Sequence, residues 1–335
     1  MSDPTTQVVA STGRRFLPLM TAIAIAVVMF VFGSLRYEHF GSPATLSNIL
    51  AGYAFVGIAA VGMTLAIISG GIDLSVGSMV AFTSILIATL VQKGLHPLAA
   101  AAIALAAGSA LGGMMGAIIH VFRLPSFIVT LAGMFAIRAL GFLVREQSLG
   151  IQHEFYSWTS RHATLTLGGG AAIPLRTMIF LAALLTGMLI ARSTAFGRNV
   201  YAIGGSARNA RLMGVNVGAT TIGVFALSGF CSALGGFAFT LYRRAGDPAA
   251  VVGLELEVIA AVVIGGTLLS GGVGGLAGTL IGIIIVGLIR TIIDFEGSLN
   301  AAWTSIATGM LLLAFVGLQQ LLATMMSRRA RDRRM

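Results

Sequence analysis

Long apolar stretches, separated by short polar segments, follow one another from residue 17 to residue 321. A helix that crosses the hydrocarbon core of a bilayer needs roughly 20 apolar residues. Backbone groups in lipid must be paired within the same segment, so these stretches are expected to be helices rather than strands. The pattern predicts an all-α, polytopic membrane protein with about ten spans, at residues 17–35, 48–68, 76–92, 97–119, 126–144, 174–191, 220–241, 257–270, 275–293 and 300–321.

The composition supports this class and excludes others. Hydrophobic residues make up 57% of the 335 residues and charged residues only 10%, whereas soluble domains carry about 25% charged residues. So few charges cannot cover a folded chain of this size in water, which excludes an ordinary soluble enzyme, a disordered protein and a collagen-like fibre. The single cysteine, Cys231, allows no intramolecular disulfide.

The charge distribution indicates partners and orientation. A net charge of +10 would suggest nucleic acid in a soluble protein. Here the arginines stand between apolar runs, so basic loops touching anionic membrane lipid are the interpretation, and no nucleic-acid partner is expected. With the N-terminus inside, twelve arginines fall in inner segments and six basic residues in outer ones. Lys and Arg are enriched on the cytoplasmic side, so both termini are expected there.

This orientation also sets the expected organisation of the chain. Arg14 and Arg15 precede the first span as in a signal peptide, but the span is long and offers no Ala-x-Ala cleavage site, so an uncleaved anchor is expected. The expected parts are an N-terminal cytoplasmic tail at 1–16, a transmembrane domain at 17–321 with a periplasmic loop at 145–173 and a cytoplasmic loop at 192–219, and a basic cytoplasmic C-terminal tail at 322–335.

Sequence motifs for catalysis or cofactor binding are missing. Lys93 is the only lysine and no Gly-x-x-x-x-Gly-Lys-Ser/Thr loop occurs, so no nucleotide site is expected. His-Glu-x-x-His, Cys-x-x-Cys and Gly-x-Ser-x-Gly are also missing. His153 and His162 are too far apart for their spacing to indicate a metal site. We therefore expect no enzymatic activity, no cofactor and no metal.

The expected spans hold almost no ionisable residues, and Arg138 is the one deep charge. Ion-coupled transporters keep Asp, Glu or His inside their helices as coupling sites. An ion-coupled secondary transporter is therefore disfavoured, as is a membrane-embedded enzyme, which would need a catalytic pair. A pathway without coupling groups must take its energy from elsewhere, and a separate ATPase acting on a cytoplasmic loop is the natural source.

Two glycines, Gly70 and Gly71, interrupt the chain after the second span. Asp73 or Ser75, just beyond them, could cap the next helix by accepting hydrogen bonds from its free N–H groups. Broken helices near membrane depth are tolerated only around a cavity or inside protein. Two interpretations stay open, a gate or pathway element and a capped turn.

The cytoplasmic loop contains the signal of a short helix. Ser206 can cap a helix over 207–213, and Gly214 can end it. Its small and apolar residues would form a dock, and its arginines could meet acceptors on a partner. A helix that lies flat against a cytoplasmic ATPase and a basic loop that lies on lipid are both compatible with this pattern.

A third block, at 253–272, carries Glu257 and a glycine-rich run. The spacing Gly-Gly-x-x-Leu-Ser-x-Gly, which begins at Gly70, recurs from Gly265 and hints at a duplicated unit. Rows of glycines at spacing four predict close helix packing. These rows are Gly108, Gly112 and Gly116, and Gly274, Gly278 and Gly282.

The three blocks together resemble the permease subunits of bacterial sugar ABC importers, the ribose/xylose/galactose permease family. The resemblance covers residues 48–316 and rests on Gly-Ile-Asp-Leu-Ser-Val-Gly-Ser at 71–78, Tyr-Ala-Ile-Gly-Gly at 201–205 and Val-Ile-Gly-Gly-Thr at 263–267. Residues 290–303 look most like the galactofuranose permeases of this family. Ala139 stands where glycine is usual and Glu257 where aspartate is common, so the choice of sugar stays open.

The resemblance implies a multi-pass subunit of the bacterial inner membrane that pairs with itself or with a related permease. It implies a periplasmic sugar-binding protein that delivers a monosaccharide of the galactofuranose or ribose type, and a cytoplasmic ATPase pair that drives alternating access. A nucleoside or another small metabolite is the alternative cargo. The implied site residues are an ATPase-coupling loop at Gly204, Gly205, Ala207, Ala210, Leu212, Met213 and Gly214, and gate or pathway positions at Asp73, Ser75, Arg138 and Glu257. For Arg138, hydrogen bonding to helix carbonyls in a purely structural role is the alternative.

Overall fold

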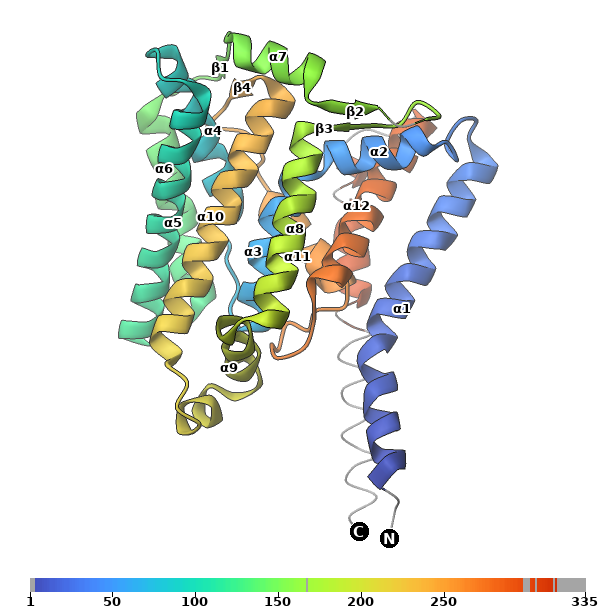
Figure 1. The fold of residues 1–335 in the computed structure, drawn as a ribbon, viewed down its shortest axis with the longest axis vertical. Helices are drawn as coiled ribbons and strands as arrows, with labels where there is room; N and C mark the ends of the chain where they lie inside the picture. Colours follow the sequence, from blue (N-terminus) through green and yellow to red (C-terminus); the bar gives the residue numbers. More distant parts are fainter. Residues whose placement is uncertain (1–3, 167, 298–301, 305, 316, 318–335) are drawn as a thin grey trace.

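The computed structural model describes residues 4–166, 168–297, 302–304, 306–315 and 317. The described chain is a bundle of helices with a few short strands at one end (Figure 1). We call this end the α7 end and the opposite one the α9 end. The elements are α1 (Pro4–Arg36), α2 (Pro43–Gly52), α3 (Ala54–Ile68), α4 (Val76–Gln92), α5 (Pro97–Phe122), α6 (Ser126–Val144), β1 (Leu149–Gly150), α7 (Glu154–His162), β2 (Thr164–Thr166), β3 (Ala172–Pro174), α8 (Leu175–Ser193), α9 (Ala195–Leu212), α10 (Val217–Arg243), β4 (Ala245–Gly246), α11 (Leu254–Ile264) and α12 (Leu276–Glu296).

Six of the described helices are long and apolar enough to cross a membrane, namely α5, α6, α8, α10, α12 and the Leu19–Arg36 part of α1. A seventh span results if α2 and α3, which meet at 62°, are counted as one. The fold thus agrees with the predicted all-α, polytopic membrane protein. The other predicted spans fall on the shorter helices α4, α11 and Ala302–Phe315. The count of ten and the cytoplasmic location of both termini remain predictions.

Two predicted spans are wrong in their extent. Residues 48–68 are not one helix, because the chain bends by 62° where α2 meets α3. Residues 257–270 are helical only up to Ile264, where α11 stops. Gly266 then turns the chain with φ +92°, a conformation that glycine adopts without steric cost.

α3 and α11 end in the same kind of turn. In each, a backbone N–H donates to the carbonyl five residues earlier, from Gly71 (2.9 Å) and from Thr267 (3.2 Å), as in a Schellman motif. Gly70 and Gly266 supply the positive φ that this motif needs, +86° and +92°. The repeated Gly-Gly pattern therefore marks a repeated turn. The positions differ by one residue, because the glycine with positive φ is the first of the pair at Gly70 and the second of the pair at Gly266.

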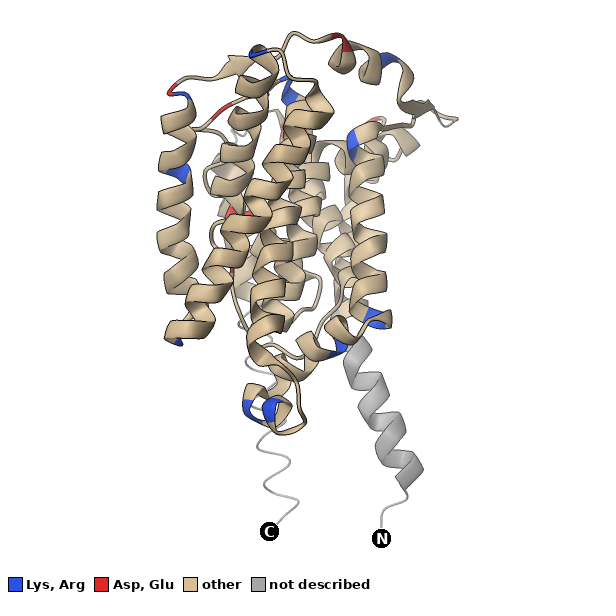
Figure 2. Cartoon of the chain, turned by 60° about the vertical axis from the view of Figure 1, so that its left-hand side comes forward, with Lys and Arg blue, Asp and Glu red and all other residues tan. Residues whose placement is uncertain are grey.

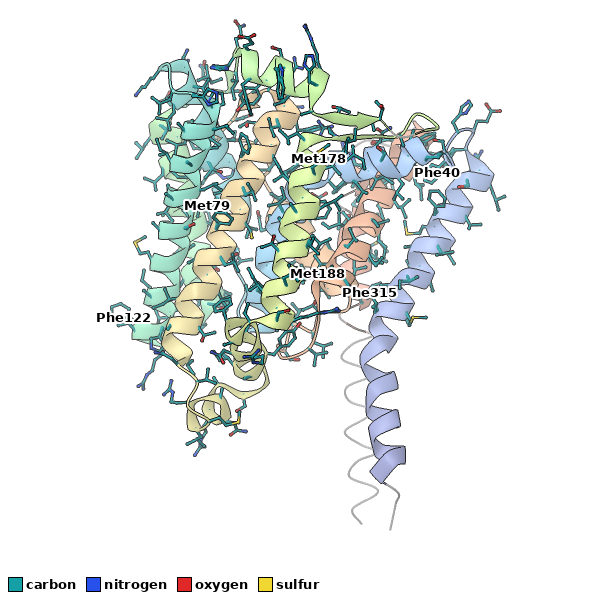
Figure 3. All side chains as sticks on the ribbon, in the orientation of Figure 1. Phe40, Met79, Phe122, Met178, Met188 and Phe315 are labelled. Atoms are coloured by element: carbon teal, nitrogen blue, oxygen red, sulfur yellow. The ribbon has the colours of Figure 1, made fainter. Side chains whose placement is uncertain are left out.

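Two irregular segments cross the interior of the bundle. Residues 70–75 run alongside α6, where Thr130 Oγ1 accepts a hydrogen bond from the Leu74 N–H (3.1 Å). α4 therefore begins inside the bundle, and Met79 in its first turn lies at mid-height (Figure 3). Residues 247–253 form the second crossing, between β4 and the start of α11.

Glycines let the central helices approach closely. α10 packs against α3, α4 and α5. A Cβ built on Gly112 of α5 would overlap the Phe225 carbonyl of α10, and the row-mates Gly108 and Gly116 also face α10. Gly278 and Gly282 of the second row face α11 in the same way. These glycines are therefore packing surfaces, as the spacing predicts.

The α7 end carries most of the predicted outer loop at 145–173. Here β1 pairs with β4 and β2 with β3, both antiparallel. α7 is capped by His153, whose Nδ1 accepts from the Phe155 N–H (3.1 Å). Tyr156 is buried, with its hydroxyl 3.0 Å from the Thr240 hydroxyl of α10. Figure 2 shows that charged residues gather mainly at the two ends of the bundle.

Candidate functional site

A cavity of about 830 Å³ lies toward the α7 end, enclosed by α2, α3, α10, α11, α12 and residues 245–251. Part of its lining comes from the chain that joins α1 to α2, which contributes His39 and Ser42. There the Tyr37 hydroxyl donates to Glu296 at the end of α12 (2.5 Å), and this hydrogen bond raises the pKa of the Tyr37 phenol. Phe40 packs edge-on against Phe295, which lines the cavity (centroids 5.4 Å).

Aromatic rings form one wall of the cavity. Phe55 on α3 packs edge-on against Phe239 (centroids 5.4 Å) and stacks on Tyr242 (6.2 Å), both on α10. The guanidinium of Arg176 lies over the Tyr242 ring at 5.2 Å. Arg176 is itself fixed, because its Nε donates to the carbonyl of Ala51 (2.8 Å). These contacts fix the orientation of the Phe55 and Tyr242 rings.

Charged and polar side chains also line the cavity. Glu257 comes from the first turn of α11 and Arg290 from α12. Arg290 pairs with Asp294 one turn later, with 3.5 Å between Nε and Oδ2. Asn48 on α2 adds an amide. Ring faces together with acceptors and donors suit an uncharged solute that carries many hydroxyls, because its C–H faces can stack while its hydroxyls are hydrogen-bonded.

Of the four predicted gate or pathway residues, Glu257 alone lines this cavity. Asp73 and Ser75 are fully buried elsewhere. The Ser75 N–H (3.0 Å) and hydroxyl (2.6 Å) both donate to Asp73 Oδ1, and the Ser228 hydroxyl of α10 donates to Oδ2 (2.7 Å). Asp73 therefore closes the turn before α4 and ties this turn to α10. The predicted cap of α4 is wrong, because no side chain caps this helix and Asp73 accepts from the N–H of Ser75, which precedes it.

Arg138 lies on α6 and donates to backbone carbonyls, although these lie in a non-helical segment and not on a helix as predicted. Its Nη1 contacts the carbonyl oxygens of Pro248 (3.0 Å) and Ala250 (2.7 Å). Both belong to the crossing segment 247–253. The same segment contributes Asp247, Ala250 and Val251 to the cavity lining. Arg138 thus acts on the wall of the cavity without lining it.

The predicted short helix in the loop 192–219 is the second half of α9. The chain is kinked at Ser206 (φ −168°, ψ 107°), whose Oγ accepts from the Asn209 N–H (3.2 Å). Gly214 follows the helix with φ +84°. The predicted N-cap and C-terminal glycine are therefore confirmed.

The exposed tip of this helix is apolar. Leu212 and Met213 are 80% and 72% exposed, and Ala207 is also exposed. Ala210 is fully buried, so it supports the helix from within and does not belong to the exposed surface. Arg208 and Arg211, among the exposed residues, flank the tip.

The three sequence blocks meet at the α9 end. The Gly272 N–H donates to the carbonyl of Ile68 (2.8 Å), and a Cβ built on Gly204 would overlap that same carbonyl. A Cβ built on Gly271 would lie 2.9 Å from Gly70. The Tyr201 hydroxyl donates to the Gly274 carbonyl (3.0 Å). The turns after α3 and α11 and the first half of α9 therefore form one tightly packed junction.

Several residues of the site were not predicted from the sequence. Phe55, Tyr242 and Phe295 were not distinguished from aromatic residues that merely anchor helix ends at a membrane surface. Arg290 and Asp294 gave a usable signal, an opposite-charge pair four residues apart at the end of an apolar stretch.

Comparison with known proteins gives a consistent result. The family described as the permease component of branched-chain amino acid transport systems matches residues 45–316. The chain is 46% identical over 308 residues to the inner membrane ABC transporter permease protein YjfF of Escherichia coli K12, covering 92% of this chain and 93% of YjfF. It is 34% identical over 299 residues to the ribose import permease RbsC of E. coli K12 (88% and 92% covered). It is 32% identical over 315 residues to the fructose import permease FruG of Bifidobacterium longum (92% of each).

Proposed function

This chain belongs to the family of permease subunits of ABC importers for sugars, and we propose that it is the subunit through which a monosaccharide crosses the bacterial inner membrane as a multi-pass protein. The galactofuranose or ribose type of sugar is the proposed cargo. ATP is hydrolysed by a separate cytoplasmic ATPase, so the subunit itself has no enzymatic activity and uses no cofactor or metal.

The observation that carries this proposal is the cavity of about 830 Å³, which is lined both by aromatic rings and by Glu257. A monosaccharide has apolar C–H faces and no net charge, so stacking against Phe55 or Tyr242 and hydrogen bonding to Glu257 satisfy both of its surfaces. A nucleoside, which has a sugar and a flat base, would suit the same wall and is the alternative cargo.

The exposed tip of α9 is the proposed contact with the ATPase. Leu212 and Met213 are apolar and exposed beside Arg208 and Arg211. A tip that combines apolar side chains with arginines suits a protein groove with acidic groups better than lipid head groups alone. The predicted coupling glycines then have distinct tasks: Gly204 packs at the junction of the three blocks, whereas Gly205 and Gly214 have no atoms near a built Cβ.

The proposed assembly contains two permease subunits, identical or related, with the ATPase pair bound at the α9 end. A periplasmic sugar-binding protein docks at the α7 end, toward which the cavity lies. In this arrangement sugar enters the cavity from outside, and the ATPase drives the change of access through the junction at Gly204.

Uptake of radiolabelled monosaccharides into membrane vesicles tests the proposal, with the complete importer and with the ATPase omitted. We expect uptake that needs ATP and the ATPase. Uptake that persists without ATP and collapses with the proton gradient would overturn it.

Glu257→Gln should raise the sugar concentration for half-maximal uptake roughly 10-fold, because a hydrogen bond to a charged group is lost.

A further inference from the structure

The crossing segment at residues 247–253 is a wall of the cavity with few outside attachments. Its start is fixed to α4, because the Asp247 N–H donates to Ser84 Oγ (3.2 Å). Beyond it, the Ala249 N–H donates to the Asp247 side chain (2.9 Å), a bond within the segment. Among the described residues, the side-chain hydrogen bonds that tie 248–253 to another element come from Arg138. Backbone N–H groups of α11 donate in addition to the carbonyls of Val251 (3.2 Å) and Gly253 (3.0 Å).

The backbone of this wall is strained. Val251 has φ +52°, in the left-handed region that a β-branched side chain rarely adopts. Strain of this kind persists only where the surroundings hold the chain in place. Val252, next along the segment, is 79% exposed, so packing on its side chain does not hold it. The two hydrogen bonds from Arg138, together with the packing of Ala250 and Val251 against the core, therefore hold a segment that favours a different conformation.

A second acceptor for Arg138 lies close by. Glu255, in the first turn of α11, and Asp247 are the acids whose charges act on Arg138. The Oε2 of Glu255 is buried and has no hydrogen-bond partner among the described residues. It would lie 2.5 Å from a Cβ built on Gly77, at the start of α4. When the guanidinium leaves the Pro248 and Ala250 carbonyls, this unpaired oxygen can receive it.

We propose that residues 247–253 are a movable gate of the cavity, that Arg138 is the latch that holds it against α6, and that Glu255 accepts the latch when the gate is open. This inference rests on the proposed transport function. Arg138 is a positioning residue, because it acts on the wall and does not line the cavity. The strain at Val251 then favours opening once the latch is released.

A reversible disulfide tests whether the wall must move. A Cβ built on Gly141 of α6 lies 3.4 Å from the Cβ of Pro248, close to the separation in disulfides. The pair Gly141→Cys and Pro248→Cys, in a Cys231→Ala background, should therefore cross-link the gate to α6. We expect oxidation to abolish ATP-driven uptake of the labelled sugar and reductant to restore it. Full uptake through the cross-linked protein would overturn the proposal.

The matched control cross-links helices that the proposal leaves in place. A Cβ built on Gly113 of α5 lies 3.5 Å from the Cβ of Ala226 on α10. The pair Gly113→Cys and Ala226→Cys should form a disulfide without loss of uptake. If this control also stops uptake, a general need for flexibility explains the result and the gate proposal fails.

A second readout needs no transported sugar and so separates this inference from the proposed function. The rate of disulfide formation at the gate pair is measured in the complete importer, without nucleotide and with ATP plus vanadate. We expect the rate to fall at least several-fold in one of these states, and equal rates would refute a moving gate. In the nucleotide state in which the gate pair cross-links faster, Arg138→Gln should lower the rate of disulfide formation. Arg138→Lys should give a rate between those of Arg138→Gln and the parent protein. Arg145→Gln is the control. Arg145 directly follows α6, the helix that carries Arg138, and its guanidinium donates to Gln92 at the end of α4. This change should leave the rate of disulfide formation unchanged.

Discussion

Gly204→Ala tests the junction at the α9 end, and the adjacent Gly205→Ala is its control. A Cβ at Gly204 would overlap the Ile68 carbonyl and approach the Gly272 N–H, both backbone atoms that cannot rotate away. Overpacking of this kind costs about 1–3 kcal/mol. Displacing the Gly272 N–H from the Ile68 carbonyl, now 2.8 Å apart, costs about 1 kcal/mol more. The expected destabilisation is therefore about 2–4 kcal/mol.

Gly205→Ala should behave differently, since nothing lies within 4 Å of a Cβ there. Alanine favours the helix over glycine by up to about 1 kcal/mol, so this variant should match or exceed the parent in stability. Thermal unfolding of the two purified proteins in detergent gives the comparison. ATPase activity of the assembled importer, with and without sugar, then reports coupling, which only Gly204→Ala should reduce. Equal melting temperatures for the two variants would refute the described packing of the junction.

Three further predictions concern other parts of the structure. Gly112→Ala should destabilise the contact of α5 with α10 by about 1–3 kcal/mol through overpacking, whereas Gly113→Ala, with ordinary contact distances, should not; thermal unfolding separates them. Asp73→Ala should lower the free energy of unfolding by several times the loss of about 1 kcal/mol expected for Ser228→Ala. The reason is that the carboxylate accepts three hydrogen bonds, whereas loss of Ser228 removes one. Equal unfolding temperatures would contradict this prediction. Gly214→Asp should uncouple ATP hydrolysis from uptake while membrane insertion stays normal, because it places an acid at the arginine-rich tip and a side chain at φ +84°; normal uptake would remove this loop from the mechanism.

Features that depend on neighbouring residues could be predicted from the sequence. The cap at Ser206 and the terminating Gly214 follow from local hydrogen bonding and from the conformational freedom of glycine. The packing role of Gly108 and Gly112 follows from spacing alone, since residues four apart share one face of a helix. The membrane class follows from composition, because the chain has too few charges for a water-covered surface.

Features that depend on distant contacts could not be predicted in this way. No local pattern places Gly204 against Ile68 or brings the Ser228 hydroxyl to Asp73, because each contact joins segments more than 100 residues apart. The bend between α2 and α3 was read as continuous helix, since an apolar run gives no sign of a change of direction. Arg138 was recognised as a deep charge, but its acceptors, on the crossing segment, became visible only in three dimensions.

The central claim is that this protein is a conduit whose opening is driven by an ATPase bound at its inner face. Reconstitution into liposomes tests it most directly, with the purified chain alone and then with the complete importer and its binding protein. The account predicts no accumulation of sugar against a concentration gradient by the chain alone, and ATP-dependent accumulation by the complete importer. Accumulation by the chain alone, driven by an ion gradient, would contradict the account.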